Sequence, residues 1–99
     1  MSFSNTYETY ILNWAFNASS VTRPTSWYIG LFTSNPGEAQ GGTELSGSGY
    51  VRQAATFTVS GNAATTSNVI EYPSATGSWG TITHIAVYDA STGGNQIAY

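Results

Sequence analysis

Residues 27–37 read Trp27-Tyr28-Ile29-Gly30-Leu31-Phe32-Thr33-Ser34-Asn35-Pro36-Gly37 and decide the fold. The first six of these are apolar, aromatic or glycine, so both faces of a strand with period two are unsuited to water. We therefore predict the central strand of a sheet over residues 26–34, which ends where proline and glycine favour a turn. Gly30 has no side chain, which predicts that a helix or a large ring from a facing sheet packs close to its backbone.

The composition indicates one small domain, residues 1–99, with a weakly charged surface. Only 7% of the residues are charged, against about 25% in an ordinary soluble domain. Surfaces of this kind repel each other weakly, which favours self-association or packing into a larger assembly. The net charge is −3 and the only cations are Arg23 and Arg52. Nucleic acid is therefore excluded as a partner, because several cations are needed to displace counterions from phosphates.

A helix is predicted over residues 5–17. Asn5 followed three residues later by Glu8 has the form of a capping box. Apolar residues then recur at the spacing of one buried helical stripe, at Tyr7, Tyr10, Ile11, Trp14, Ala15 and Ala18. The stripe is expected to lie across the sheet. Alternatively, Trp14 and the tyrosines dock on a neighbouring subunit.

Further strands are predicted over residues 50–59, 68–72, 81–88 and 95–99, each bounded by turn residues. The sum is a mainly β domain, a small antiparallel sandwich or open barrel with the N-terminal amphipathic helix packed across it. The strand at 95–99 ends abruptly and is expected to leave an unpaired sheet edge, which needs cover from another chain or element.

The sequence offers little chemistry. His84 is the single histidine and falls within a strand, so we interpret it as structural and predict no catalytic residue. The chain has no cysteine, and no apolar run approaches the ~18 residues that cross a bilayer, so no membrane partner is expected. Glu38 and Glu44 lie in one glycine-rich loop; two carboxylates are weak grounds for a cation site, and solvation is the preferred interpretation. No metal or cofactor is predicted.

Four segments carry a resemblance to a known family: residues 31–36, 42–53, 75–84 and 88–95. In this order they resemble a family of small tailed-bacteriophage virion structural proteins, labelled tail-fibre-like or head-decoration proteins. The resemblance implies a structural, non-enzymatic role without a cofactor, in a virion assembled from proteins made in the host cytoplasm. Members of the family are expected to continue past the Gly93-Gly94-Asn95 turn, so the chain is either a short form or a fragment.

Two virion roles follow from the resemblance, and a third role follows from the aromatic residues. The preferred role is a capsid decoration or cement subunit that stabilises the outside of the head. The alternatives are a tail or tail-fibre adaptor or tip protein, and a carbohydrate-binding module built on Trp79 and the tyrosines. Other virion proteins, namely the major capsid protein or tail proteins, are the expected partners, together with further copies of the chain.

The residues expected at an interface are Tyr10, Trp14, Glu38, Glu44, Gln96, Ile97 and Tyr99. Structural roles are expected for Arg52, Trp27 and Trp79, the two tryptophans as core rings in preference to ligand platforms. Arg52 is predicted to pair with Glu44 and to fix the long loop between residues 35 and 49. The pair matters only if it is partly buried, because an exposed pair contributes under ~1 kcal/mol.

Overall fold

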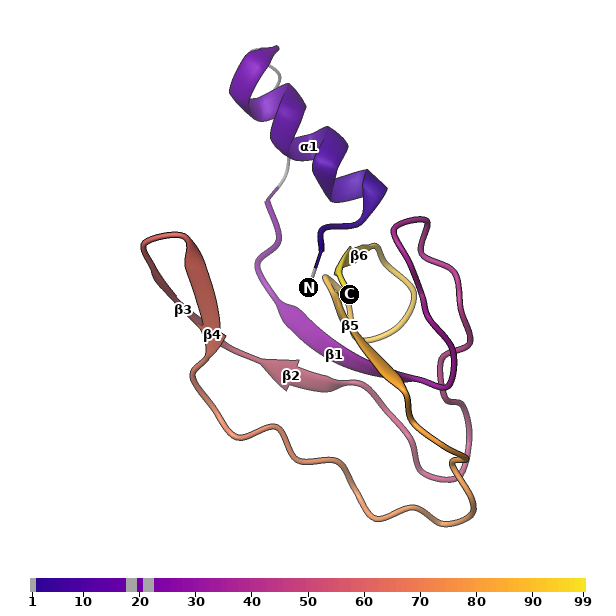
Figure 1. Ribbon diagram of the computed structural model, residues 1–99. Helices are drawn as coiled ribbons and strands as arrows, with labels where there is room; N and C mark the ends of the chain where they lie inside the picture. Colours follow the sequence, from indigo (N-terminus) through magenta and orange to yellow (C-terminus); the bar gives the residue numbers. More distant parts are fainter. Residues whose placement is uncertain (1, 18–19, 21–22) are drawn as a thin grey trace.

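The computed structural model describes residues 2–17, 20 and 23–99, which form one helix and six strands. The elements are α1 (Asn5–Phe16), β1 (Trp27–Phe32), β2 (Gln53–Ala55), β3 (Phe57–Ser60), β4 (Ala63–Thr66), β5 (His84–Tyr88) and β6 (Gln96–Ala98). Four strands make an antiparallel sheet in the order β2-β1-β5-β6, and β3 and β4 form a separate hairpin (Figure 1). The predicted mainly β, antiparallel class with one N-terminal helix is confirmed, and the described strands close no barrel.

β1 is an interior strand of the larger sheet, as its two apolar faces predict. It pairs with β2 on one side and with β5 on the other, with Ile29 opposite Val87. Ile29, Val87 and Ile97 face a core that also holds Tyr7 of α1. The opposite face of the sheet carries a second core, made of Phe32, Ala86 and Tyr88.

A close approach to Gly30 is present, but a different group makes it. A β-carbon at Gly30 would lie 2.9 Å from Oε2 of Glu44 and 3.3 Å from Cε1 of Phe32. The prediction that a helix or a ring from a facing sheet packs against Gly30 is therefore wrong. The loop after β1 folds back over this face of the sheet, and its carboxylate occupies the space that a side chain would fill.

α1 begins one residue earlier than a cap at Asn5 predicts. Ser4 is the N-cap: its hydroxyl accepts a hydrogen bond from the backbone N–H of Tyr7 at 3.3 Å and donates one to the carbonyl of Gln96. Ser4 is preferred because it also pairs with β6, which is a tertiary contact that a local capping pattern does not contain.

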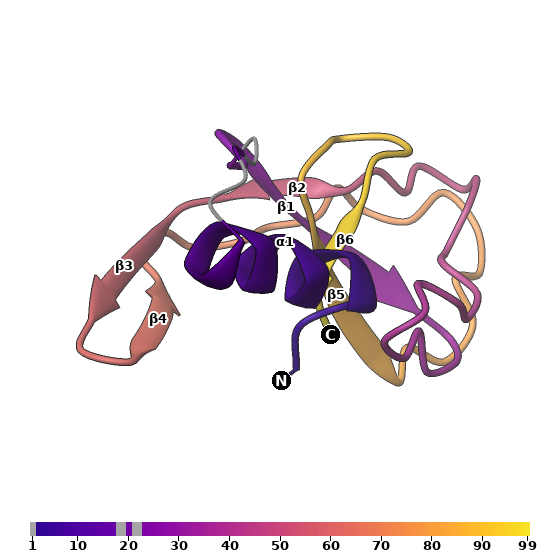
Figure 2. The same ribbon diagram turned by 90° about the horizontal axis from the view of Figure 1, so that it is seen from above.

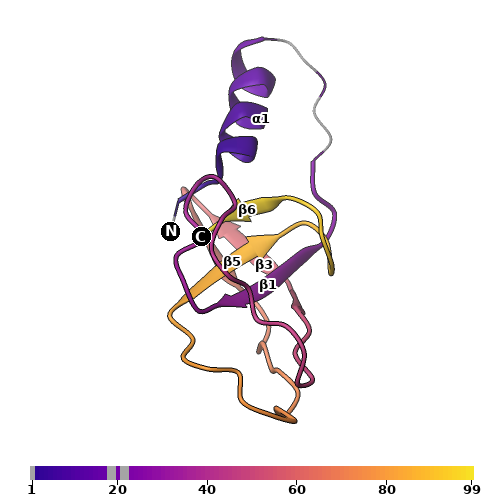
Figure 3. The ribbon, with the colours of Figure 1, turned by 90° about the vertical axis from the view of Figure 1, so that its right-hand side faces the viewer.

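α1 does not lie across the sheet. Of its residues only Tyr7 is buried, and the helix rises from the end of the sheet where β6 lies (Figure 1, Figure 3). The expected burial of the apolar stripe is therefore wrong beyond Tyr10, because Ile11 and Trp14 are exposed. Ala18, the last residue of the predicted stripe, falls outside the described residues. The molecule is correspondingly elongated, with a radius of gyration of 14.4 Å against about 13 Å for a compact domain of this length.

The edge of β6 is not left unpaired. Residues 2–4 run alongside it, with mutual backbone hydrogen bonds between Ser2 and Tyr99 and one from Ser4 to Ile97. The segment that covers this edge comes from the start of the same chain. This pairing joins residues more than ninety positions apart, so nothing local in the sequence predicts it.

The strand expected over 50–59 is interrupted at Thr56, and none forms over 68–72. The chain turns at residues 61–62, directly after β3, and β4 pairs with β3. The hairpin partner therefore lies closer in sequence than the apolar residues after Asn68 suggest. Residues 67–83 instead run without regular strand and reach the sheet by a side chain: Tyr72 donates a hydrogen bond to the carbonyl of Ile29 at 2.6 Å. The strands expected over 26–34, 81–88 and 95–99 form over shorter ranges.

Candidate functional site

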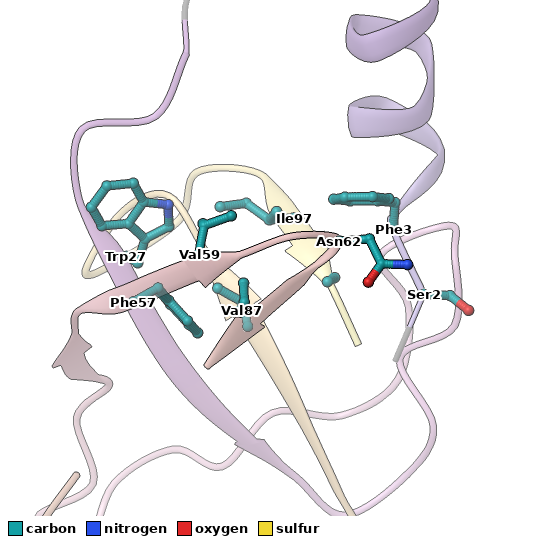
Figure 4. Close-up of a pocket in the computed structure, with 10 residues that line it drawn as sticks. Ser2, Phe3, Trp27, Phe57, Val59, Asn62, Val87 and Ile97 are labelled. Carbon is teal, nitrogen blue, oxygen red and sulfur yellow. The ribbon is translucent and has the colours of Figure 1, made fainter. Parts of the chain in front are cut away.

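An apolar groove lies between the β3–β4 hairpin and the larger sheet. The hairpin stands at one end of the molecule, and the loop that follows β1 lies at the other end (Figure 2). The groove encloses about 460 Å³ and is lined by Ser2, Phe3, Trp27, Phe57, Val59, Asn62, Ala64, Val87, Ile97 and Ala98 (Figure 4). No charged side chain lines it, and all but Ser2 and Asn62 are apolar. We call this set of residues the apolar groove.

The wall of the apolar groove is part core and part open surface. Trp27 and Phe57 pack against the buried residues Val87 and Ile97, with the two rings edge to face at a centroid distance of 6.4 Å. In contrast, Val59 is 73% exposed and Phe3 is 50% exposed. Trp27 thus packs against the core and also borders the groove. The side of the groove that Val59 and Phe3 form is therefore open to solvent.

A second apolar surface lies on α1. Ile11, Leu12, Trp14 and Phe16 are all exposed, Trp14 by 71% and Phe16 by 84%. Ile11 and Trp14 share one side of the helix, and Leu12 and Phe16 share another. We call the surface of these four residues the exposed helix face. Tyr10, by contrast, packs edge to face on Tyr7 at 5.1 Å and belongs to the edge of the core. Of the two interface candidates on the helix, Trp14 is therefore accessible and Tyr10 is half-buried.

Arg52 pairs with Glu44 on the opposite face of the sheet, as predicted. Its Nε and Nη2 each donate to one carboxylate oxygen of Glu44 at 2.8 Å, and its Nη1 donates to the carbonyls of Ala90 and Gly93. The guanidinium carbon lies 3.7 Å from the ring centroid of Tyr88. One side chain thus joins the long loop, the β5–β6 turn and the core of this face.

Electrostatics around this pair favour the ionised carboxylate. Burial by itself raises the pKa of the Glu44 carboxyl. Hydrogen bonds from Arg52 and Tyr50 and the charge of the guanidinium together lower the pKa by more than burial raises it, so the pKa of Glu44 lies below its usual range. Tyr50 donates to Glu44 at 2.6 Å. The pKa of Tyr50 is raised, first by burial and then by that hydrogen bond.

Trp79 is held in an aromatic cluster with Tyr50 and Tyr72. Its ring lies edge-on to both tyrosines, at 5.8 and 6.5 Å, and its indole N–H donates to the carbonyl of Ser48 at 2.9 Å. Burial raises the pKa of Tyr72 to about 12. The indole N–H thus joins the loop that carries Trp79 to the loop that carries Ser48.

The remaining interface candidates are not gathered at one place. Gln96 is fully buried, and its amide donates to the carbonyl of Gly37 at 2.8 Å. It therefore supports the loop inside the chain instead of offering a contact surface. Ile97 lines the apolar groove, Tyr99 packs against the core of the opposite face, and Glu38 is exposed, with its backbone carbonyl bonded to the N–H of Asn5.

The described residues show few arrangements suited to chemistry. His84 is exposed, and its Nδ1 lies 2.8 Å from the hydroxyl of Thr83. Within residues 2–17, 20 and 23–99, no three histidine or acidic side chains gather in a way that could hold a metal ion. A search of the same residues finds no helix of the length and apolarity that crossing a membrane requires.

Sequence reasoning missed most of the apolar groove. Phe3, Phe57, Val59 and Val87 come from an arm, a hairpin and a sheet strand that only the fold brings together. A signal for the exposed helix face was present: Leu12 and Phe16 lie outside the predicted stripe, so the helix is apolar almost all round. Such helices are normally buried on every side.

A β-rich chain with two uncharged apolar surfaces and an ion-paired loop has the features of a subunit of a larger assembly. Comparison with protein families gives the family to which the chain belongs. The chain belongs to the Gp80 family, described as podophage GP4 fiber I protein gp80, whose model matches residues 2–99. No curated protein matches the chain. The predicted resemblance to tailed-phage virion proteins is confirmed, and the protein is a phage virion component that is assembled after synthesis in the host cytoplasm.

Proposed function

We propose that the protein is a structural, non-enzymatic subunit of a phage tail fibre, held in the particle by its apolar groove and its exposed helix face. One observation carries this proposal: a chain of a fibre family exposes large apolar side chains on two sides of a single short helix, with Trp14 71% exposed on one side and Phe16 84% exposed on the other. Large exposed apolar patches mark interaction sites. The partners proposed are other virion proteins and further copies of the chain.

Capsid decoration is the second candidate. The low charge of the chain supports it, since 7% charged residues is low enough for close packing of many copies on a shell. The family description favours the fibre, so we place the fibre first. A tip role in carbohydrate binding is less well supported, because Trp79 already uses its N–H and its ring edge within the chain.

Copy number distinguishes the two candidates. Quantitative mass spectrometry of purified particles measures the chain relative to the major capsid protein, with the portal or a tail protein of known symmetry as the internal standard. A small number of copies, in a simple ratio to a tail protein, is expected for a fibre. A ratio close to that of the capsid lattice would refute the fibre role and support decoration. Absence from purified particles would refute both.

A further inference from the structure

We propose that α1 of one copy of the chain docks in the apolar groove of a second copy, with Trp14 and Ile11 seated against Trp27, Phe57 and Val59. This inference rests on the proposed structural role and names the partner of its two apolar surfaces. Each copy carries one helix and one groove. The contact can therefore close a symmetric ring, extend as an open helical filament, or form reciprocally across a two-fold axis.

The exposed area of the chain matches what such a contact needs. Its accessible surface is 6258 Å². A folded monomer of this mass is expected to expose about 5,400 Å², so the excess is about 850 Å². A specific interface of standard size buries about 800 Å² from each partner. The excess exposed area of the chain is thus roughly equal to the area that one partner buries in a stable contact.

The two surfaces are also compatible in charge. No charged residue lines the apolar groove, and the exposed helix face has none. Glu8, in the first turn, is the only charged residue of α1. Copies that each carry a net charge of −3 can therefore bring these surfaces together without placing like charges in contact.

The helix of the same chain does not fill the groove. Ser4 and Tyr7 fix the start of α1 against β6, and from Phe3 the helix runs away from the groove (Figure 4). Trp14 remains 71% exposed and is not among the lining residues. A helix from a second copy satisfies both surfaces at once, because an apolar helix inserted in a groove is a common mode of recognition.

Sedimentation equilibrium of the full chain tests the proposal with matched variants. Trp14→Glu impairs the helix and Val59→Glu impairs the groove. Each is expected to weaken self-association at least ~30-fold, the factor that corresponds to a hot-spot residue. Val69→Glu is the control, because Val69 is 81% exposed but belongs to neither surface. Mixing the two impaired variants is expected to restore a one-to-one complex, since one keeps an intact groove and the other an intact helix.

Three results would overturn the proposal: a wild-type chain that stays monomeric at high concentration, an equal effect of Val69→Glu, or no complex in the mixture. Far-UV circular dichroism verifies that the variants fold. Because the chain has no cysteine, a mixture of Ala15→Cys and Ala64→Cys chains gives a second test by oxidative cross-linking that keeps Trp14 and Val59 in place: Ala15 follows Trp14 on α1 and Ala64 lines the groove. Val69→Cys is the control. A monomeric chain that is nevertheless present in tail fibres would refute this inference but leave the proposed function intact.

Discussion

Replacing Arg52 with alanine removes a side chain that joins three parts of the molecule. The guanidinium donates two hydrogen bonds to Glu44 and two to the carbonyls of Ala90 and Gly93, and it stacks on the ring of Tyr88. In the Arg52→Ala variant the Glu44 carboxylate loses both hydrogen bonds from Arg52 and keeps the one from Tyr50. The long loop therefore loses the part of its attachment to the β5–β6 turn that Arg52 provides, and it keeps the hydrogen bond from Gln40 to the carbonyl of Gly94.

The burial of the pair sets the size of the effect. The side chain of Arg52 is 8% exposed and that of Glu44 is 23% exposed. Removing one partner of a fully buried pair costs about 3–5 kcal/mol, and an exposed pair is worth under about 1 kcal/mol. We expect Arg52→Ala to lower the free energy of unfolding by about 2–3 kcal/mol, between these limits. For a domain of this length the melting temperature should fall by about 10–20 °C.

Thermal unfolding followed by near-ultraviolet circular dichroism measures this loss, because Trp79 and its neighbouring tyrosines report on the packing of the loops. Arg23→Ala is the matched control: it removes the other cation of the chain, changes the net charge equally and lies at an exposed position. Its effect should stay within about 0.5 kcal/mol. Equal melting temperatures for the two variants would refute the structural role of Arg52.

Three further substitutions test the same face of the sheet. Glu44→Gln should lower stability at pH 7, and the difference from wild type should shrink as the pH falls below about 4.3, the ordinary pKa of glutamate, because the lowered pKa of Glu44 favours the folded state only while the carboxylate is ionised. Gly30→Ala should cost about 1–3 kcal/mol, since its β-carbon would lie 2.9 Å from a carboxylate oxygen that Arg52 holds in place. Tyr72→Phe should cost about 1 kcal/mol through the lost hydrogen bond to Ile29. The pKa of Tyr72 is raised to about 12 in the folded chain, so above pH 10 the unfolded chain loses the phenolic proton first and the folded state becomes less stable. Tyr72→Phe removes this proton and should therefore reduce the loss of stability above pH 10.

Urea unfolding at several pH values measures all three. A constant difference between wild type and Glu44→Gln from neutral to acid pH would contradict the coupling to Arg52. The clash at Gly30 is tested in a Glu44→Ala background, where the substitution should cost less than in wild type; an equal cost would show that the carboxylate is not responsible. For Tyr72→Phe, an alkaline loss identical to that of wild type would contradict the assignment.

Parts of the fold that depend on local pattern could be predicted from the sequence. The two apolar faces of residues 27–32 sufficed to place β1 inside the sheet, because a strand buried on both sides must have neighbours on both. The pair of Arg52 with Glu44 was accessible for a different reason. With five acidic residues in the chain, Arg52 has few carboxylates from which to find a partner.

Parts that depend on distant contacts could not be predicted. The cover of β6 by residues 2–4 joins the two ends of the chain. The apolar groove likewise forms only because the β3–β4 hairpin folds toward Trp27 and Val87. The helix was misplaced because its periodicity shows which face is apolar but not which molecule covers that face. An apolar stripe is equally consistent with packing on its own sheet or on a second copy.

A cryo-electron microscopy map of the intact virion, at a resolution that separates helices from strands, tests the central claim most directly. We predict density for this chain in the tail fibres, with α1 and the apolar groove both covered by protein. Density in the fibres with both surfaces open to solvent would contradict the assignment of these surfaces to assembly. Density on the capsid lattice alone would contradict the fibre role itself.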